Sequence, residues 1–410
     1  MSSFRSLPRD AWLTATARGQ SILGDEVAYV ALAWRLKGHG PGFIMALALS
    51  LAIPQVLISP WAGLLADRLP ARRLVSITTM AQALVCVALV WTSPLLSVVC
   101  MALLSLGSAI ANPAMGALVP RLVPAEELPQ FMGLASTFTS LGAILGPAVG
   151  GTLVAVAGTH VPLVLDAASF AVYAVLIRLL KTDRVPEKRP RSQRQPREWA
   201  AGWRVLRADP VMATLLTILV FAVLGIGAIN VAEVFFITQT LHGSSLVYGI
   251  LGLTFGGGNL VGALLFPRLK VPRPRRPLAA MLCSWSIASG ILIFGVSRTA
   301  WMAAVGCLIV GIANGTINML FGLLMADRVP DEVRGRFGAV FGSAVTSASI
   351  TSMVAAGALL PLFAPETILT GGGVLAVVAC GCGLPFLLRA LRREAHLKMP
   401  NPPHGTTISA

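Results

Sequence analysis

Long apolar stretches separated by short polar joints recur along the whole chain. Each is roughly 20 residues or longer, the length that an α-helix needs to cross a hydrocarbon layer about 30 Å thick. Lipid offers the backbone no hydrogen-bond partners, so spans of this length are helices rather than isolated strands. The pattern predicts twelve transmembrane helices, at 12–34, 42–65, 74–92, 95–118, 131–157, 161–180, 211–238, 246–267, 278–297, 300–325, 337–362 and 367–388.

Composition and charge agree with an all-α polytopic membrane protein. Of the 410 residues, 55% are hydrophobic and 12% are charged, against about 25% charged in a typical globular domain. A net charge of +15 in a soluble chain suggests nucleic acid, but here the charges lie in short loops without interleaved stacking aromatics. We therefore expect the basic loops to face lipid headgroups and expect no nucleic-acid partner.

The positive charges lie almost entirely on one side of the predicted helices. Lys and Arg occupy the N-terminal segment, every second joint and the C-terminal segment, and only Arg35, Lys37 and Arg298 fall in the opposite joints. By the positive-inside rule, both termini are cytoplasmic and the chain is a multi-pass protein of the cytoplasmic membrane.

The one long polar connection, 182–209, separates six predicted helices from six. We expect an N-terminal six-helix bundle at 1–181, a cytoplasmic linker at 182–209, a C-terminal six-helix bundle at 210–392 and a disordered tail at 393–410. The halves repeat: a shift of 206 residues aligns Asn112 with Asn318, and a shift of 205 aligns Asp25 with Asn230. Two copies in the same orientation form pseudo-symmetric bundles, an arrangement in which substrate binds between the halves near the midplane.

Four carboxylates fall inside predicted helices: Asp25, Glu26, Asp166 and Glu233. No Lys or Arg lies clearly inside a span to neutralise them, and desolvation favours the protonated form of such a group. Each can bind a proton or attract a cationic ligand. Asp25, midway along its helix, is the strongest candidate for proton coupling. Glu233 is a candidate for substrate or proton contact, Glu26 lies about 100° further round the helix, and Asp166 is either functional or a capping group near the outer end of its span.

Three asparagines complete the candidate site. Asn112 and Asn318 occupy matching places in the fourth and tenth helices, either as cavity hydrogen-bonders or as structural bonds between helices. Asn230 replaces the counterpart of Asp25, which places the proton chemistry mainly in the first half.

A charged turn follows the second predicted helix, with the sequence Gly63-Leu-Leu-Ala-Asp67-Arg68-Leu-Pro-Ala-Arg72-Arg73. It resembles the loop signature of the major facilitator superfamily, G-x-L-A-D-R-x-G-R-K, and the plan of two six-helix halves extends the resemblance over most of the chain. Pro70 and Ala71 depart from the signature. The resemblance implies a conformational latch in which Asp67 docks against a helix N-terminus and an arginine; ordinary positive-inside charge is the alternative.

The fifth predicted helix carries a run of small residues, Gly142, Gly146, Pro147, Gly150 and Gly151. Small residues on one helix stripe allow close helix packing. The run resembles the motif of drug/proton antiporters in the same superfamily, and a purely structural interface is the alternative.

Further short motifs narrow the resemblance: Gly24-Asp25, the run from Asp166 to Phe170, and the loops that begin at Val123-Pro124 and Val329-Pro330. They are similar to the branch that holds macrolide efflux proteins and the enterobactin exporter. That branch implies export of small, partly apolar molecules by proton antiport with alternating access, with antibiotic resistance among the consequences.

Other functions are less compatible with the sequence. No G-x-x-x-x-G-K-[ST] loop is present to hold nucleotide phosphates, and all five His residues lie outside the predicted helices. We therefore expect no enzyme, metal or cofactor, and a monomer whose partners are a small-molecule substrate, protons and lipids. Siderophore export is the alternative cargo, disfavoured by the lack of a buried Arg, and a transport-inactive membrane sensor or scaffold is the alternative of another class.

Overall fold

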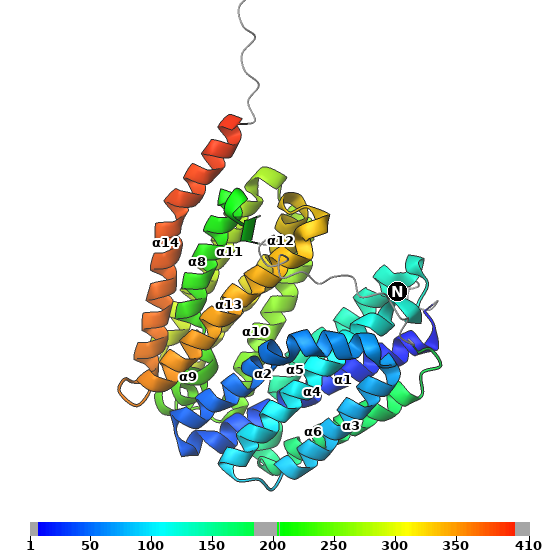
Figure 1. The fold of residues 1–410 in the computed structure, drawn as a ribbon. Helices are drawn as coiled ribbons and strands as arrows, with labels where there is room; N and C mark the ends of the chain where they lie inside the picture. The colour runs from blue at the N-terminus through cyan, green and yellow to red at the C-terminus, as the bar shows by residue number, and fades with distance from the viewer. Residues whose placement is uncertain (1–6, 184–202, 205, 398–410) are drawn as a thin grey trace, which may run out of the picture.

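The computed structural model describes residues 7–183, 203, 204 and 206–397, and it is helical almost throughout (Figure 1). The first half consists of α1 (Arg9–Leu36), α2 (Pro41–Arg68), α3 (Ala71–Leu89), α4 (Pro94–Leu122), α5 (Leu128–Ala157) and α6 (His160–Arg178). The second half consists of α8 (Pro210–Ile226), α9 (Ile229–Phe235), α10 (Ser245–Leu265), α11 (Arg276–Val296), α12 (Ala300–Arg328), α13 (Asp331–Leu359) and α14 (Pro365–Leu397).

The predicted twelve-helix membrane architecture is confirmed. Among the described residues, eleven helical segments are long and apolar enough to cross a membrane, and α1, with 28 residues, is the twelfth long helix. Arg18, Asp25 and Glu26 lie within α1 and make it the least apolar of the set. The helix that fits a lipid environment least well on composition is therefore the one that carries the candidate chemistry.

The seventh span differs from the continuous helix predicted at 211–238. It consists of α8, a break at residues 227–228, the short α9 and a π-helical turn at Phe236–Thr240. The Asn230 side-chain amide donates to the Gly227 carbonyl oxygen at 3.1 Å, which satisfies a backbone group freed by the break. Gly227 also lies against Ser352 of α13, where a Cβ atom would come within 2.8 Å of the serine Cβ.

The ends of the chain only partly fall within the described residues. α14 extends to Leu397, so residues 393–397, assigned to the tail from the sequence, are helical. The charged residues Arg389, Arg392 and Arg393 end the apolar pattern but not the helix. The tail at 398–410 and most of the linker at 182–209 lie outside the described residues, and both remain predictions.

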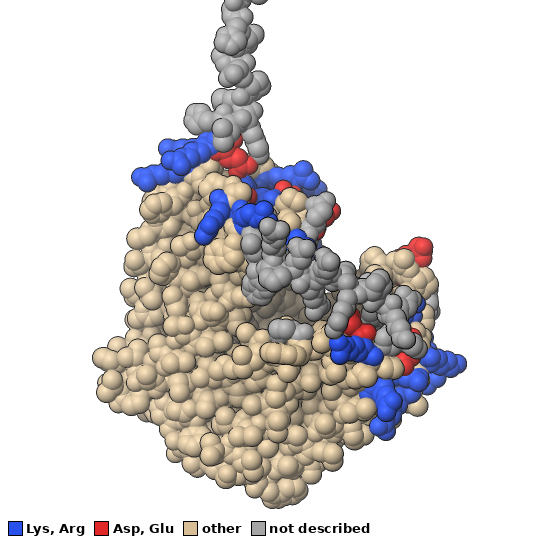
Figure 2. Space-filling view, viewed as in Figure 1, with Lys and Arg blue, Asp and Glu red and all other residues tan. Residues whose placement is uncertain are grey.

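The two ends of the helix bundle differ in charge. We call the end that carries the start of α1, the α2–α3 turn and the C-terminus of α14 the basic end, and the other the opposite end. In Figure 2 the visible Lys and Arg side chains lie along the basic end of both halves, above a surface of uncharged side chains. The helices of the two halves converge at the opposite end and diverge toward the basic end (Figure 1).

Small residues close the opposite end. The Ser245 hydroxyl of α10 donates to the Gly151 carbonyl oxygen of α5 at 2.9 Å, which joins the two halves. A Cβ atom on Gly249 would lie 2.5 Å from the Pro147 carbonyl oxygen. The backbones of α5 and α10 therefore touch directly, which requires glycine.

The other face of α5 packs against α1 within the first half. A Cβ atom on Gly142 would lie 2.5 Å from the Gly19 carbonyl oxygen, and one on Gly150 would lie 3.0 Å from Val27 Cα. Gly146 lies against the Glu26 side chain. The small-residue run of α5 thus has two faces, one on the helix that bears the acids and one on the closing surface.

Replacing Gly249 with Ala should force the halves apart at the opposite end. The added methyl overlaps the Pro147 carbonyl, and overpacking of this kind costs about 1–3 kcal/mol. Spin labels at Val156→Cys and Leu362→Cys, both on exposed positions of this end, should report a longer distance. Gly257→Ala on the same helix is the matched control because its Cβ meets nothing within 4 Å; identical distance distributions for the two variants would contradict the closure described.

Candidate functional site

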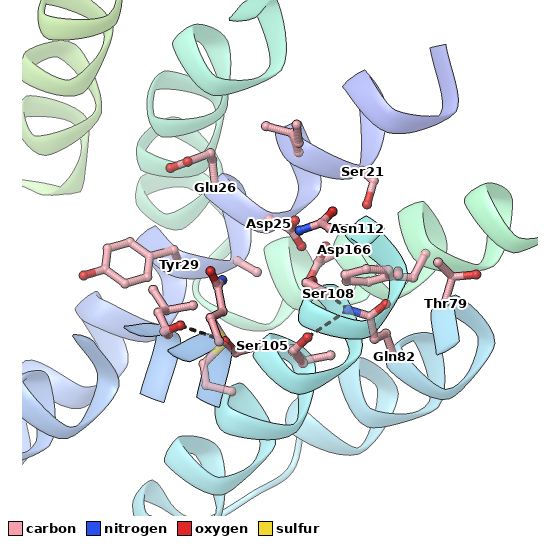
Figure 3. Close-up of a pocket in the computed structure, with 18 of the residues that line it drawn as sticks. Ser21, Asp25, Glu26, Tyr29, Thr79, Gln82, Ser105, Ser108, Asn112 and Asp166 are labelled. Carbon is pink, nitrogen blue, oxygen red and sulfur yellow. Dashed lines mark hydrogen bonds between the residues drawn. The ribbon is translucent and has the colours of Figure 1, made fainter. Parts of the chain in front are cut away.

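A cavity of about 620 Å³ lies within the first half and reaches the second half at one edge; we call it the central cavity. Helices α1, α2, α3, α4 and α6 form most of its wall, and the second half contributes Asn230 and Met353. Its polar lining residues, several of which are labelled in Figure 3, are Arg18, Ser21, Asp25, Glu26, Tyr29, Gln55, Thr79, Gln82, Ser105, Ser108, Asn112, Asp166, Tyr173 and Asn230.

Helical periodicity places the α1 side chains in this wall. Arg18, Ser21, Asp25 and Tyr29 follow one another at intervals of three or four residues, so they share one stripe of the helix. All of them line the central cavity. Gly19, Leu23 and Val27 face α5 instead, so α1 is closely packed on one side and polar on the other.

Asp166 lies inside the cavity wall and is not a capping group at the helix end. Asp166 is buried, with 1% of its surface exposed. The Cys86 thiol donates to its Oδ2 at 3.2 Å, and the Ser169 hydroxyl donates to its Oδ1 at 3.3 Å. Gln20 of α1 donates to the Ser169 carbonyl oxygen at 2.8 Å, which links α1 to this part of α6.

Gly24 allows α1 to approach Asp166 closely. A Cβ atom at residue 24 would lie 2.7 Å from Asp166 Oδ1 and would also overlap the Ser169 hydroxyl. This approach brings Asp25 into electrostatic range of Asp166, and the two carboxylates lie on the same side of α1 in Figure 3. Asp25 makes no hydrogen bond or ion pair within the described part of the chain, so cavity water or a ligand is left to solvate it.

Arg18 overturns the expectation that no cation lies within a span. Its guanidinium donates to Asn112 Oδ1 at 3.1 Å and acts electrostatically on Tyr173 and Asp25. From the sequence, Arg18 was counted with the N-terminal positive charges, but it lies on α1 and lines the cavity. The central cavity therefore holds three carboxylates and one guanidinium.

Glu26 of the central cavity and Glu233 of α9 lie near the same two tyrosines. Glu26 and Tyr29 point away from Asp25 and Asp166 in Figure 3. Glu26, from the first half, and Glu233, from α9 of the second, both lie within electrostatic range of Tyr29 and Tyr248. The α9 neighbours of Glu233 belong to an apolar cluster shared with α1. Two acids from opposite halves thus lie close to the surface that closes the opposite end.

The matching asparagines of the two halves do not meet. Asn112 lines the central cavity and accepts from Arg18. Asn318 lines a different cavity within the second half, and its amide donates to the Asn314 carbonyl oxygen at 2.9 Å. Asn230, by contrast, reaches the central cavity from the seventh span.

The predicted latch residues lie at the basic end, away from the central cavity. Asp67, Arg68 and Arg73 are exposed, and Gly63 is half-buried. The Arg72 guanidinium donates to the Leu180 carbonyl oxygen at 2.6 Å and lies 3.7 Å from Asp183 Oδ2. Arg72 therefore ties α3 to the end of α6 within one half, and a latch between the halves remains a prediction.

Sequence reasoning missed several polar residues of the cavity wall. Gln82 of α3 donates to the Leu104 carbonyl oxygen at 2.9 Å and to the Ser108 hydroxyl at 3.0 Å, which joins α3 to α4. Tyr29 and Tyr173 also line the cavity. These residues could have been identified from the sequence, because they are polar residues inside otherwise apolar spans, where a polar group requires a partner.

The arrangement suits the binding of protons and polar ligands. Within residues 7–183, 203, 204 and 206–397, no group of three or more His, Cys, Asp or Glu side chains is placed to hold a metal ion. Buried carboxylates with hydroxyl and amide neighbours can exchange protons with cavity water. They can also attract a cation when they are ionised.

Comparison with known proteins gives the same architecture. The sequence model of the Major Facilitator Superfamily matches residues 17–353 and 215–405. The MFS-type transporter YfiS of Bacillus subtilis is 26% identical over 82% of this chain and 80% of its own. Macrolide efflux protein A of Streptococcus pyogenes is 23% identical over 90% and 94% of the two chains. The multidrug efflux pump Tap of Mycolicibacterium fortuitum is 24% identical over 85% and 90%.

Solved structures share the fold at low sequence identity. The nucleoside transporter NupG superposes with a TM-score of 0.72 at 12% identity, over 93% of this chain and 99% of the other. At this identity the likeness concerns the arrangement of helices and not the ligand. The low identity also means that the side chains of the central cavity must be interpreted from this chain itself.

Replacing Gly24 with Ala should displace Asp166 and Ser169 from their present positions. We expect a loss of about 1–3 kcal/mol of stability, as for other overpacked sites, and weaker ligand binding in the central cavity. Thermal unfolding in detergent would measure the first effect. Gly133→Ala is the control, because its Cβ meets nothing within 4 Å; equal melting temperatures would show that the contact at Gly24 is not tight.

Proposed function

Because the chain belongs to the Major Facilitator Superfamily, we propose that it exports small, partly apolar molecules across the cytoplasmic membrane in exchange for protons. The observation that carries the proposal is the central cavity, where Asp25 and Asp166 lie in a wall formed by the first half and Asn230 and Met353 of the second half complete the lining. Efflux relatives such as macrolide efflux protein A support the direction of transport. A transporter of this kind is not an enzyme, since its cargo crosses the membrane unchanged.

The positive-inside rule gives the orientation. The basic end carries most Lys and Arg residues, so it faces the cytoplasm together with both termini. With α5 and α10 in contact at the opposite end, this conformation corresponds to the inward-facing state of an alternating-access cycle. Cargo then enters the central cavity from the cytoplasm or the inner leaflet.

Competition between protons and cargo supplies the coupling. Asp25 and Asp166 lie close to each other in a poorly hydrated wall, so full ionisation of both is unfavourable without a compensating positive charge. A proton or a cationic group of the cargo provides that charge. Binding of cargo on the cytoplasmic side releases protons, and protons that enter from outside displace the cargo there.

Arg18 gives specific support to a second cargo class. Its guanidinium lies in the cavity wall, so an anionic catecholate, as in a siderophore, has one cationic partner. The three carboxylates of the same cavity disfavour such an anion unless they are protonated. Neutral or cationic cargo therefore remains the leading assignment, and siderophore export is the alternative.

A transport-inactive sensor or scaffold is the alternative of another class. Such a protein needs the fold but not unpaired carboxylates in the cavity wall. Burial of these groups is unfavourable, and a purely structural protein gains nothing from it. Proton-dependent flux separates the two assignments.

Asp25→Asn should abolish proton-driven efflux while the protein remains folded in the membrane. The amide keeps the shape of the side chain but cannot carry a proton. Everted vesicles energised by respiration, with and without a protonophore, measure the flux of a lipophilic cation. The exposed Glu126→Gln serves as the control; efflux by Asp25→Asn at the control rate would remove Asp25 from the coupling mechanism.

Asp67→Ala should slow the transport cycle without erasing ligand binding. We assign Asp67 to the latch that holds the cytoplasmic side closed in the outward-facing state, so its loss shifts the equilibrium toward the inward-facing state. Parallel assays of flux and equilibrium binding test this. A variant with normal flux, or one that loses both flux and binding, would argue against a latch.

A further inference from the structure

Both carboxyl oxygens of Asp166 accept hydrogen bonds, from donors on two helices. The Cys86 thiol of α3 donates to Oδ2 at 3.2 Å, and the Ser169 hydroxyl, about one turn further along α6, donates to Oδ1 at 3.3 Å. Cys86 is fully buried, and Asp166 is 1% exposed. An ionised Asp166 therefore has a partner for each oxygen, although little of the side chain reaches water.

Asp25, the neighbouring acid, has different surroundings. It is half-buried and lines the central cavity, and among the described residues it has neither a hydrogen bond nor an ion pair. Beside it, Gly24 packs on Asp166, where a Cβ atom at residue 24 would lie 2.7 Å from Asp166 Oδ1. The two carboxyl groups are therefore neighbours, but Asp25 is more open to cavity water than Asp166.

The hydrogen bonds give the two acids different preferences. An ionised carboxylate only accepts hydrogen bonds, so two donors favour the ionised form of Asp166. A proton on an oxygen that already accepts would force the donor to turn away, and a buried donor without a partner costs free energy. A proton on Asp25 breaks no such bond.

We propose that Cys86 is a positioning residue for proton coupling: together with Ser169 it holds Asp166 as a fixed carboxylate, so that Asp25 exchanges the proton with cavity water. The inference rests on the proposed function and assigns separate parts to the two acids. The fixed charge of Asp166 attracts a cationic group of the cargo whether or not Asp25 is protonated. The other charged or titratable side chains that act on these three residues are Arg18, Glu26, Tyr173 and Cys100.

The alternative is that Cys86 only fills space, because it belongs to an apolar cluster of the first half. Cys86→Ala removes the donor, and Cys86→Ser replaces the thiol with a hydroxyl that can donate in the same place. Cys100→Ala is the matched control. Cys100 is a buried thiol of the same cluster, whereas the donors to Asp166 are Cys86 and Ser169.

The experiment measures binding of tetraphenylphosphonium to the full chain in lipid nanodiscs, from mildly alkaline to mildly acidic pH. Cys86→Ala should bind about two- to tenfold more weakly than the wild type, the effect of one lost hydrogen bond. The deficit should grow as the pH falls, because an Asp166 that has lost its donor takes up a proton and no longer attracts the cation. Cys86→Ser should restore the wild-type affinity, and Cys100→Ala should keep it.

Infrared difference spectroscopy examines the bond itself. The S–H stretching band of Cys86, identified by its loss in Cys86→Ala, should be that of a hydrogen-bonded thiol both with and without tetraphenylphosphonium. The band of a free thiol in either state would overturn the inference, because Asp166 would then lack the donor that fixes it.

The binding outcomes separate this inference from the proposed function. Equal affinity of Cys86→Ala and Cys100→Ala would overturn the inference, and so would a deficit of the same size at every pH, because packing alone would explain it. A folded Cys86→Ser with the deficit of the alanine variant would overturn it as well. Wild-type protein without proton-driven efflux contradicts the proposed function but leaves the comparison of the cysteine variants valid.

Discussion

The constraint on which this molecule depends is the placement of carboxyl groups away from bulk water, in a cavity wall that the first bundle forms and that Asn230 and Met353 of the second bundle complete. Asp25 and Asp166 lie within electrostatic range of each other in one wall, so their ionised forms repel, and Arg18 offsets part of that repulsion. The occupancy of the wall by protons or cations is thereby linked to the shape of the cavity.

Close helix packing connects the acidic wall to the closed end of the molecule. One face of α5 packs on α1 through Gly142, Gly146 and Gly150, and the other face reaches α10 through Gly151. The helix that supports the acidic side chains is therefore also the helix that closes the opposite end. A change in the position of α1 near Glu26 must be accommodated by α5, because a backbone contact without side chains leaves no flexible group to absorb it.

The two halves have kept the same framework and diverged in chemistry. The first half holds the charged wall, and the second half has neutral amides and aromatic rings around a cavity of about 460 Å³ between α8, α11, α12 and α13. Apolar contacts are non-directional and proportional to buried area, so such a cavity selects for size and hydrophobicity more than for a single structure.

The sequence predicted the fold far better than the site. Twelve helices follow from hydropathy because only helices satisfy the backbone in lipid. The break at Gly227 was missed because its neighbours are apolar and only a tertiary contact with α13 shows it. Arg18 fell inside the helix predicted at 12–34 but was counted with the N-terminal positive charges, because charge counting does not say which side of a helix faces a cavity. Asn318 was grouped with Asn112 because a repeat aligns residues but does not say which cavity each one lines.

The most direct test of the account is the release of protons when ligand binds. A lipophilic cation such as tetraphenylphosphonium, added to the purified chain in weakly buffered detergent solution near neutral pH, should release protons that a pH indicator dye detects. The same addition to Asp25→Asn should release fewer. Binding that saturates without any proton release, at a strength independent of pH, would contradict the claim that cargo and protons compete for the carboxylates of the central cavity.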